Sequence, residues 1–532
     1  YDSLNRMVEE VQNGRPVSSG YVSDDRVDLH YPGAGRVVHY AYDAHHQLTA
    51  VSNFTLVAIN MSLLGGVPCP PSPSLLTTFA AAGQAPSLTV TQQCNANRLL
   101  FQQWQISSTA GQIGYRFYNR NRENDVTSWG GLTGAGTGTN IFTESNNLNL
   151  DSLGRQTLFN AFLNGPPGVT RSQRRQDLNG AQGVPEVRDN ANQLVQQVTH
   201  SPTHEPMDGL TLHNASPGTG IRTRDTNFVY QWDGLNRLRV VRQRTVPTNI
   251  VASYNYDAWP AIHGGRRVQK IVAYSGSLDG TNRFYYDGPN AIEETVVSTN
   301  ERVARQFLFG RQPDEVLAMD ADTNNDGQPD SLQFYLRDHN NNTTQLVNAN
   351  GTPAEFYFYD YRGRPRFFNA TNNAAMTNSA VGNPYLFTGQ RYDPETGLYY
   401  YKARYYDPTF GVFLSRDPLG FWFDPLNHGN PMALVGNNAW NRRDPSGLGL
   451  WSWLMGRGWD EQPPENPPPP KYSDAWVEWQ LSEAKQKEKA KIGNAVAEGC
   501  YGMAEGGAKT LVLAGDTAAG ATLPISCLKA TL

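Results

Sequence analysis

The 532-residue sequence is poor in charge, in cysteine and in long apolar runs. Only 17% of its residues are charged, and 49 acidic against 44 basic residues give a net charge of −5. Nucleic-acid binders need clustered positive charge, so this balance argues against that class. The longest weakly charged stretch, residues 510–528, still contains Asp516 and Pro524, which disfavours a membrane-spanning helix. The first residues are charged and no apolar run follows them, unlike a signal peptide.

Four cysteines are too few for a disulfide scaffold, and their spacing does not fit a zinc site. Two disulfides, Cys69–Cys94 and Cys500–Cys527, are compatible with the sequence, and so are four free thiols. The cysteines therefore leave the redox compartment open.

The sequence is rich in glycine, proline and aromatic residues, and it contains an internal repeat. Each unit has an aromatic residue, an aspartate, turn residues, a polar residue and an apolar one. Units of this form occur at Tyr1–Met7, Tyr42–Leu48 and Trp232–Leu238, and in part at 151–155, 189–194 and Tyr359–Arg364. Aspartate begins a turn, glycine or asparagine accepts its left-handed end, and period-two alternation resumes afterwards. Each unit is therefore predicted to be a strand, a tight turn and a strand.

These units resemble the YD repeats of the RHS family, which includes the shells of Tc toxin C proteins, wall-associated polymorphic toxins and teneurins. The resemblance implies a mainly β fold, in which a spiral of YD-repeat β-hairpins forms a hollow cocoon, complete or partial, around a C-terminal polypeptide. Because the chain opens inside a repeat, we expect it to be the C-terminal part of a longer protein.

The repeats and the composition divide the chain into six segments. We expect YD-repeat shell at 1–62, a β insertion or diverged repeats at 63–145, further shell at 146–380, an RHS repeat-associated core at 381–448, a proline-rich linker at 449–471 and a variable, partly helical tail at 472–532. We expect aromatic residues such as Trp104 and Trp129 to be exposed, which makes a sugar-binding module the alternative for the second segment.

One loop in the shell offers oxygen ligands at alternate positions, with Gly327 at its bend. Gln333 stands where an EF-hand has its bidentate glutamate, so the loop is closer to the short Asp-rich loops of extracellular repeat proteins. It predicts a structural calcium ion bound by Asp322, Asn324, Asp326 and Asp330. An ordinary hairpin turn is the alternative.

Aromatic density rises between Asn383 and Asp417, where ten tyrosines and phenylalanines fall within 35 positions. The string Tyr385–Gly420 is similar to the RHS repeat-associated core almost residue for residue. In relatives, this string ends in an Asp-Pro-x-Gly element, and a second element, Asp-Pro-x-Gly-Leu, follows after a short stretch. The resemblance implies that the protein cuts itself after that leucine, with paired aspartates in an aspartyl-protease-like arrangement.

The matching aspartates are Asp417 and Asp444, and the predicted scissile bond joins Leu448 to Gly449. Two carboxylates held close together cannot both ionise easily, so one can polarise the peptide carbonyl while the other activates water. Arg416 matches an arginine near the catalytic aspartate in some toxin C shells, where its implied role is to hold the charged partner.

The sequence departs from the family pattern between the two aspartates. The segment 421–443 is longer than usual, and Asn430–Leu434 stands where relatives commonly show Asn-x-Tyr-x-Tyr. The alternative to catalysis is that both aspartates only cap Asp-Pro turns.

After the core, a polyproline spacer precedes a helix predicted to begin at Ser473. The resemblance implies that this tail holds variable cargo, often a toxin. It contains no histidine, which disfavours histidine-based nuclease chemistry in the cargo.

The leading functional prediction is a bacterial RHS shell, secreted or on the cell surface, that encapsulates its C-terminal polypeptide as toxin cargo and releases it by aspartate-dependent self-cleavage after Leu448. No other enzymatic motif is evident, and no cofactor is expected apart from structural calcium. The expected partners are the tail itself, a cell-surface carbohydrate or protein receptor and an immunity protein, with no nucleic acid for the shell. The alternative is a carbohydrate- or partner-binding adhesion protein that does not cleave itself.

Overall fold

The computed structural model describes the chain from residue 2 to residue 449. The gaps in this range fall at 3, 5, 34, 45, 47, 54–56, 65–73, 82–85, 95–100, 109–110, 121–124, 134–141, 151–155, 165–169, 177–185, 189–193, 198–209, 212–220, 258–264, 311–313 and 419–431. The linker and tail after residue 449, including the helix predicted from Ser473, lie outside the described residues. In the described ranges, no helix is long and apolar enough to cross a bilayer.

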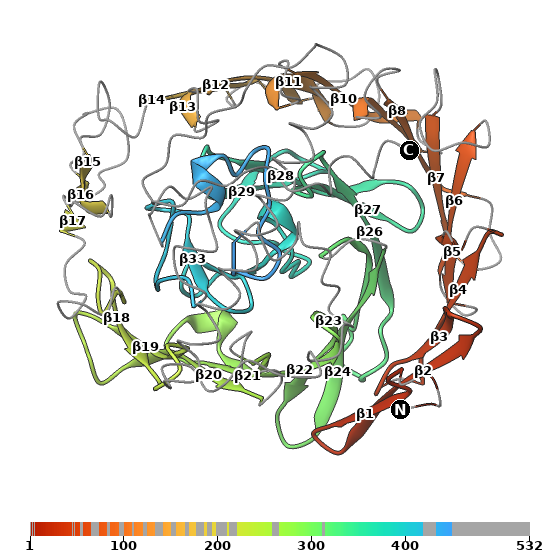
Figure 1. The fold of residues 1–532 in the computed structure, drawn as a ribbon, viewed down its shortest axis with the longest axis horizontal. Helices are drawn as coiled ribbons and strands as arrows, with labels where there is room; N and C mark the ends of the chain where they lie inside the picture. Colours follow the sequence, from red (N-terminus) through yellow and green to blue (C-terminus); the bar gives the residue numbers. More distant parts are fainter. Residues whose placement is uncertain are drawn as a thin grey trace, which may run out of the picture. The chain divides into compact units, whose positions relative to one another are not determined.

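The described part of the chain is almost entirely antiparallel β structure (Figure 1), which confirms the predicted mainly β class. The first sheet has 14 strands that pair in chain order. They are β1 (Glu9–Gln12), β2 (Arg15–Val22), β3 (Asp25–His30), β4 (Val37–Tyr42), β5 (Leu48–Asn53), β6 (Val57–Leu64), β7 (Ser74–Ala81), β8 (Leu88–Cys94), β9 (Phe101–Ser108), β10 (Gly111–Arg120), β11 (Val126–Thr133), β12 (Phe142–Leu150), β13 (Gln156–Asn164) and β14 (Thr170–Gln176). The segment 63–145 thus continues the same meander.

A short second sheet precedes a third sheet of 13 strands, again paired in chain order. The second sheet contains β15 (Glu186–Arg188), β16 (Leu194–Gln197) and β17 (Leu210–Thr211). The third contains β18 (Phe228–Trp232), β19 (Leu238–Gln243), β20 (Ile250–Tyr256), β21 (Arg267–Val272), β22 (Gly280–Asp287), β23 (Asn290–Val297), β24 (Glu301–Phe309), β25 (Val316–Ala321), β26 (Ser331–Arg337), β27 (Thr343–Asn348), β28 (Pro353–Tyr359), β29 (Pro365–Asn369) and β30 (Ala375–Met376).

The described residues of the predicted core segment form a fourth sheet of four short strands and two 3₁₀ turns. These elements are η3 (Phe387–Gly389), β31 (Arg391–Asp393), β32 (Leu398–Tyr400), β33 (Tyr405–Asp407), β34 (Val412–Phe413) and η6 (Val435–Asn437), and a further 3₁₀ turn, η2 (Gly276–Leu278), lies in the third sheet's loops. Buried side chains of the first, third and fourth sheets, such as Val51, Phe334 and Tyr399, belong to one hydrophobic cluster.

The repeat unit forms a turn that is closed by its aspartate, here called a YD turn. Asp233 Oδ1 accepts the backbone N–H groups of Leu235 and Arg237, both at 3.0 Å. Arg237 Nε donates back to Asp233 Oδ2 at 2.8 Å, and Asn236 takes the left-handed φ of 59° that the pattern predicts. The turns at Asp2 and Asp360 use the same bond to the N–H four residues on, each at 2.9 Å. The aspartate carboxylate thus sets the geometry of each turn.

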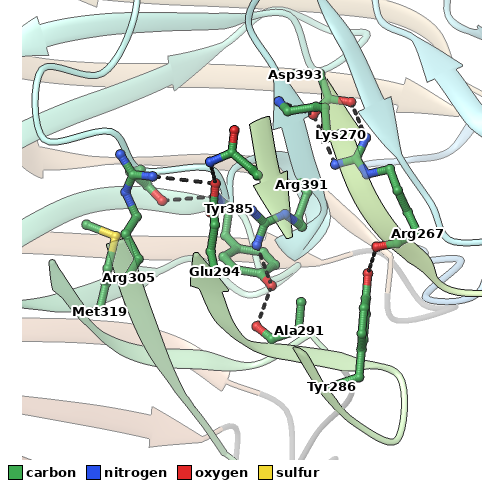
Figure 2. A network of polar contacts seen from close by, with 12 residues as sticks. Arg267, Lys270, Tyr286, Ala291, Glu294, Arg305, Met319, Tyr385, Arg391 and Asp393 are labelled. Carbon is green, nitrogen blue, oxygen red and sulfur yellow. Dashed lines mark hydrogen bonds and ion pairs between the residues drawn. The ribbon is translucent and has the colours of Figure 1, made fainter. Parts of the chain in front are cut away.

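The fourth sheet is attached to the third by a network of buried charges (Figure 2). Arg267 and Asp393, each 1% exposed, pair at 3.1 Å between Nη2 and Oδ1, and Lys270 Nζ lies 3.0 Å from the same oxygen. Burial raises the pKa of Asp393, but the charges of Arg267 and Lys270 outweigh it and hold that pKa at about 2. Arg391 of β31 pairs in the same way with Glu294 of β23, at 2.7 Å. These pairs fix β31 against the third sheet.

A second set of contacts joins the turns of β1–β4 to β22–β25. Tyr31 donates its hydroxyl to the Phe307 carbonyl at 2.6 Å. Glu293 is fully buried there, and its Oε2 accepts the Gly33 N–H at 3.0 Å and the Gln306 amide at 2.7 Å. The nearest cation, Arg15, is 4.0 Å from Oε1. Burial therefore dominates and raises the pKa of Glu293 to about 7.

Replacing Asp393 with asparagine leaves Arg267 buried without its charge partner. We expect Asp393→Asn to lower the free energy of unfolding by about 3–5 kcal/mol, as measured by denaturant unfolding. The control is Glu315→Gln, which removes a pair with Arg337 that is partly open to solvent and is expected to cost less than about 1 kcal/mol. Equal effects of the two substitutions would contradict this account of the attachment.

The raised pKa of Glu293 predicts a pH dependence of stability. Since the folded-state pKa of about 7 exceeds the ordinary glutamate pKa of 4.5, the folded state favours the protonated carboxyl. The protonated Glu293 carboxyl therefore contributes to the free energy of unfolding, and this contribution is fully present below the unfolded-state pKa. Roughly 3 kcal/mol of it is lost as pH rises to about 7. We expect Glu293→Gln to remove this slope when unfolding is followed between pH 4.5 and 8. Parallel curves for the variant and the wild type would refute the assignment.

Candidate active site

The structure brings Asp417 and Asp444 together, although 26 residues separate them in the sequence. Asp417 follows β34 and is 6% exposed, and Asp444 follows η6 and is 1% exposed. Their Oδ2 atoms lie 3.0 and 3.1 Å from one nitrogen, Nη2 of Arg404. The two carboxylates therefore share a single cation in a water-poor environment.

Arg404 was not identified from the sequence. It lies in the loop between β32 and β33, its side chain is fully buried, and its guanidinium lies 3.7 Å from the Phe413 ring centroid. The guanidinium stacks on this ring while its edge binds the acids, which suits arginine better than lysine. Arg416, the arginine selected by resemblance, is exposed. The only sequence signal for Arg404 is a charged residue within the densest aromatic run.

Asp444 directly contacts the predicted scissile peptide group. Its Oδ1 accepts the Leu448 N–H at 3.0 Å, and its Oδ2 accepts the Gly449 N–H at 2.9 Å. The first bond spans four residues, as in a YD turn. The returning arginine of the repeat is replaced here by Leu448, which is 1% exposed. The Asp444 turn is thus a YD turn whose carboxylate faces the Leu448–Gly449 bond.

The groups around the aspartates are also held in a low-dielectric environment. Burial raises the pKa of Tyr401, and the charge of Asp444 adds to this shift. The Tyr401 hydroxyl lies 2.8 Å from Thr388 Oγ1. Burial lowers the pKa of Lys402 against the opposing charge of Asp314, with which it pairs. An added charge here would have little water to stabilise it.

The candidate calcium residues occupy a hairpin loop between β25 and β26, and they bond mainly within it. Asp322 Oδ2 pairs with Arg302 at 2.8 Å and accepts the Gly327 N–H at 2.9 Å. Asp330 accepts the Thr323 hydroxyl at 2.7 Å, and Asn324 accepts the Asp326 N–H at 2.9 Å. Over the described part of the chain, no three histidine, cysteine or acidic residues gather as metal ligands would. Calcium binding stays a prediction.

The aromatic residues suggested for sugar binding are placed differently. Trp129 is 2% exposed and stacks on Trp440 at 4.6 Å between ring centroids, so its face is not available to a sugar ring. The side chain of Trp104 lies outside the described residues.

No protein-family model matches the chain, but named relatives do. The chain is 32% identical over 243 residues to the tRNA3(Ser)-specific nuclease WapA of Bacillus spizizenii, which covers 44% of the chain and 9% of WapA. It is 29% identical over 240 residues to toxin protein Tse5 of Pseudomonas aeruginosa, covering 41% of the chain and 17% of Tse5. It is 26% identical over 464 residues to the probable deoxyribonuclease RhsA of Dickeya dadantii, covering 84% of the chain and 29% of RhsA. The chain thus spans less than a third of each relative.

Among solved structures, the fold is similar to that of the TcdB2-TccC3-TEV crystal structure, with a TM-score of 0.54, 16% identity, and coverage of 82% of this chain and 21% of that one. The Tc holotoxin pore of Photorhabdus luminescens gives a TM-score of 0.51, 14% identity, and coverage of 82% and 21%. At sequence identities this low, the similarity to these structures establishes a common fold and nothing more. A meander of strands with YD turns packs on a core that contains the paired aspartates. This arrangement defines the class as a YD-repeat β protein. The chain belongs to the RHS repeat family.

The shared cation predicts how removing Arg404 affects stability. In Arg404→Met the two buried carboxylates repel each other, so we expect about 3–5 kcal/mol less stability at pH 7. The folded variant then binds a proton more tightly than the unfolded chain, so this loss shrinks as pH falls. Denaturant unfolding between pH 5 and 8 measures it.

The control is Arg404→Met combined with Asp417→Asn and Asp444→Asn, in which both buried carboxylates are gone and this pH dependence should disappear. A loss that is the same at pH 5 and pH 8 in the single variant would show that Arg404 does not hold the two charges together.

Proposed function

We propose that this chain contributes to an RHS shell that encapsulates its tail, residues 449–532, and releases it by hydrolysis of the Leu448–Gly449 bond. The observation that carries the proposal is the position of Asp444, whose carboxylate accepts the N–H groups of Leu448 and Gly449 at 3.0 and 2.9 Å. Asp322 also binds the N–H groups four and five residues on, in a hairpin loop. Asp444 differs because its carboxylate shares the buried guanidinium of Arg404 with a second acid, Asp417.

The geometry supports different roles for the two acids. Asp444 lies at the leaving nitrogen of Gly449, so when protonated it is placed to donate a proton there as the C–N bond breaks. Asp417 is then the base that takes a proton from water while the water oxygen bonds to the Leu448 carbonyl carbon. The products are the Leu448 carboxylate and the Gly449 amine.

Arg404 supports the protonation state that this reaction needs. With both acids ionised, the two carboxylates and the guanidinium carry one net negative charge, and one added proton neutralises the buried group. The pair can then hold a single shared proton, as in other paired-aspartate sites.

The relatives support a toxin as the cargo. WapA and RhsA are named as nucleases and Tse5 as a toxin protein, and the chain matches only part of each. We propose that the tail is the toxin portion of a secreted or cell-surface protein. An immunity protein in the producing bacterium and a receptor on the target cell are its expected partners.

The proposal is tested by intact mass in a time course of cell-free synthesis of the full chain. We expect the wild type to yield a fragment that begins at Gly449. Asp417→Asn and Asp444→Asn are each expected to cut at least about 100-fold more slowly, because each removes a proton-transfer group.

The matched control is Asp233→Asn, which makes the same chemical change in an ordinary YD turn of the third sheet and should leave cutting intact. An uncut wild type, or aspartate variants that cut at the wild-type rate, would reject self-cleavage by this pair.

A further inference from the structure

Three successive residues of one loop bind three successive carbonyl groups just before the proposed scissile bond. Lys402 Nζ donates to the Pro445 carbonyl at 2.7 Å, and the Ala403 N–H donates to the Ser446 carbonyl at 3.1 Å. Arg404 Nε donates to the Gly447 carbonyl. The loop 402–404, between β32 and β33, thus pairs residue by residue with 445–447. We call this set of bonds the ladder.

The ladder is tightly packed at Gly447, which has a φ of 71°. A Cβ atom there would lie 2.4 Å from the Tyr401 carbonyl oxygen and 3.1 Å from the Arg404 nitrogen. Backbone atoms cannot yield to such contacts as a flexible side chain can. Any side chain at this position would therefore separate the two segments.

The same loop also holds the acids. Arg404 binds the Gly447 carbonyl through Nε and both aspartates through Nη2. Lys402 is fixed in turn by Asp314 and by Gln390, whose Oε1 lies 3.1 Å from Nζ. One rigid loop thereby sets the distance between the acids and the chain to be cut.

We propose that the 402–404 loop sets the register of self-cleavage. The bond that is cut is then the second peptide bond after Gly447, whichever residue occupies the position of Leu448. In this account Lys402 and Arg404 are positioning residues, and the ladder selects the bond by counting from Gly447 rather than by recognising the leucine side chain. The inference rests on the proposed self-cleavage. It adds which residues choose the bond.

The position of the cut tests this choice directly. Inserting Ala-Gly between Gly447 and Leu448 leaves every ladder residue in place and puts a glycine where Gly449 stands, with its left-handed φ of 82°. The ladder predicts a cut between the inserted alanine and glycine. The released fragment then begins with the inserted glycine and is heavier than the wild-type fragment by one glycine and one leucine residue.

The outcomes of the insertion separate the two proposals. A cut after Leu448 in the insertion variant would overturn the register proposal while leaving self-cleavage intact. An uncut insertion variant beside a cut wild type would also count against the register, because every ladder residue is retained. An uncut wild type would instead reject the proposed function.

A second pair of variants tests the ladder without lengthening the chain. We expect Gly447→Ala to slow cutting at least tenfold in the same time course. Its matched control is Gly397→Ala, a glycine with a φ of 74° in the β31–β32 turn, where the nearest atom to an added Cβ is 3.8 Å away. Both variants carry left-handed strain, but only the first disrupts the ladder. Equal cutting rates in the two would overturn the proposal.

Discussion

The structure depends on the bond between an aspartate carboxylate and the backbone N–H four residues later. At Asp233 and Asp360 this bond closes YD turns between strands, and at Asp2 it closes a turn that precedes β1. At Asp233 the arginine of the turn binds the carboxylate in return. Charge-assisted bonds to backbone N–H groups are stronger than neutral ones, so each turn fixes its own register. Because neighbouring strands pair in chain order, such local turns can fix the register of consecutive strands.

The candidate site uses the same turn with two changes. Leu448 stands where Arg237 stands in the turn of Asp233, and the cation arrives instead from Arg404 of a neighbouring loop. The freed carboxylate oxygen then accepts the Gly449 N–H. A structural turn thereby becomes an acid next to a peptide bond, with Asp417 supplying the second acid. The surrounding tyrosines and phenylalanines exclude water, which strengthens these charge interactions.

Much of the fold could be predicted from the sequence because its signals are local. Alternating residues and the aspartate turns indicated the strands, and the core motif indicated Asp417, Asp444 and the bond after Leu448. The rest depends on contacts between distant residues. Arg404 pairs with Asp444, 40 positions away, and Gly33 binds Glu293, 260 positions away. Trp129 of the first sheet is buried against Trp440, which follows η6. No spacing rule marks such pairs, so Trp129 was expected to be exposed.

The most direct test of the central claim is synthesis of the full chain in heavy-oxygen water, followed by mass analysis of the peptide that contains Asp444. Hydrolysis by an aspartate-activated water predicts a peptide that ends at Leu448 and carries one heavy oxygen atom in its new carboxylate. A peptide that continues intact through Gly449, or a label in the Asp444 side chain instead, would contradict the account.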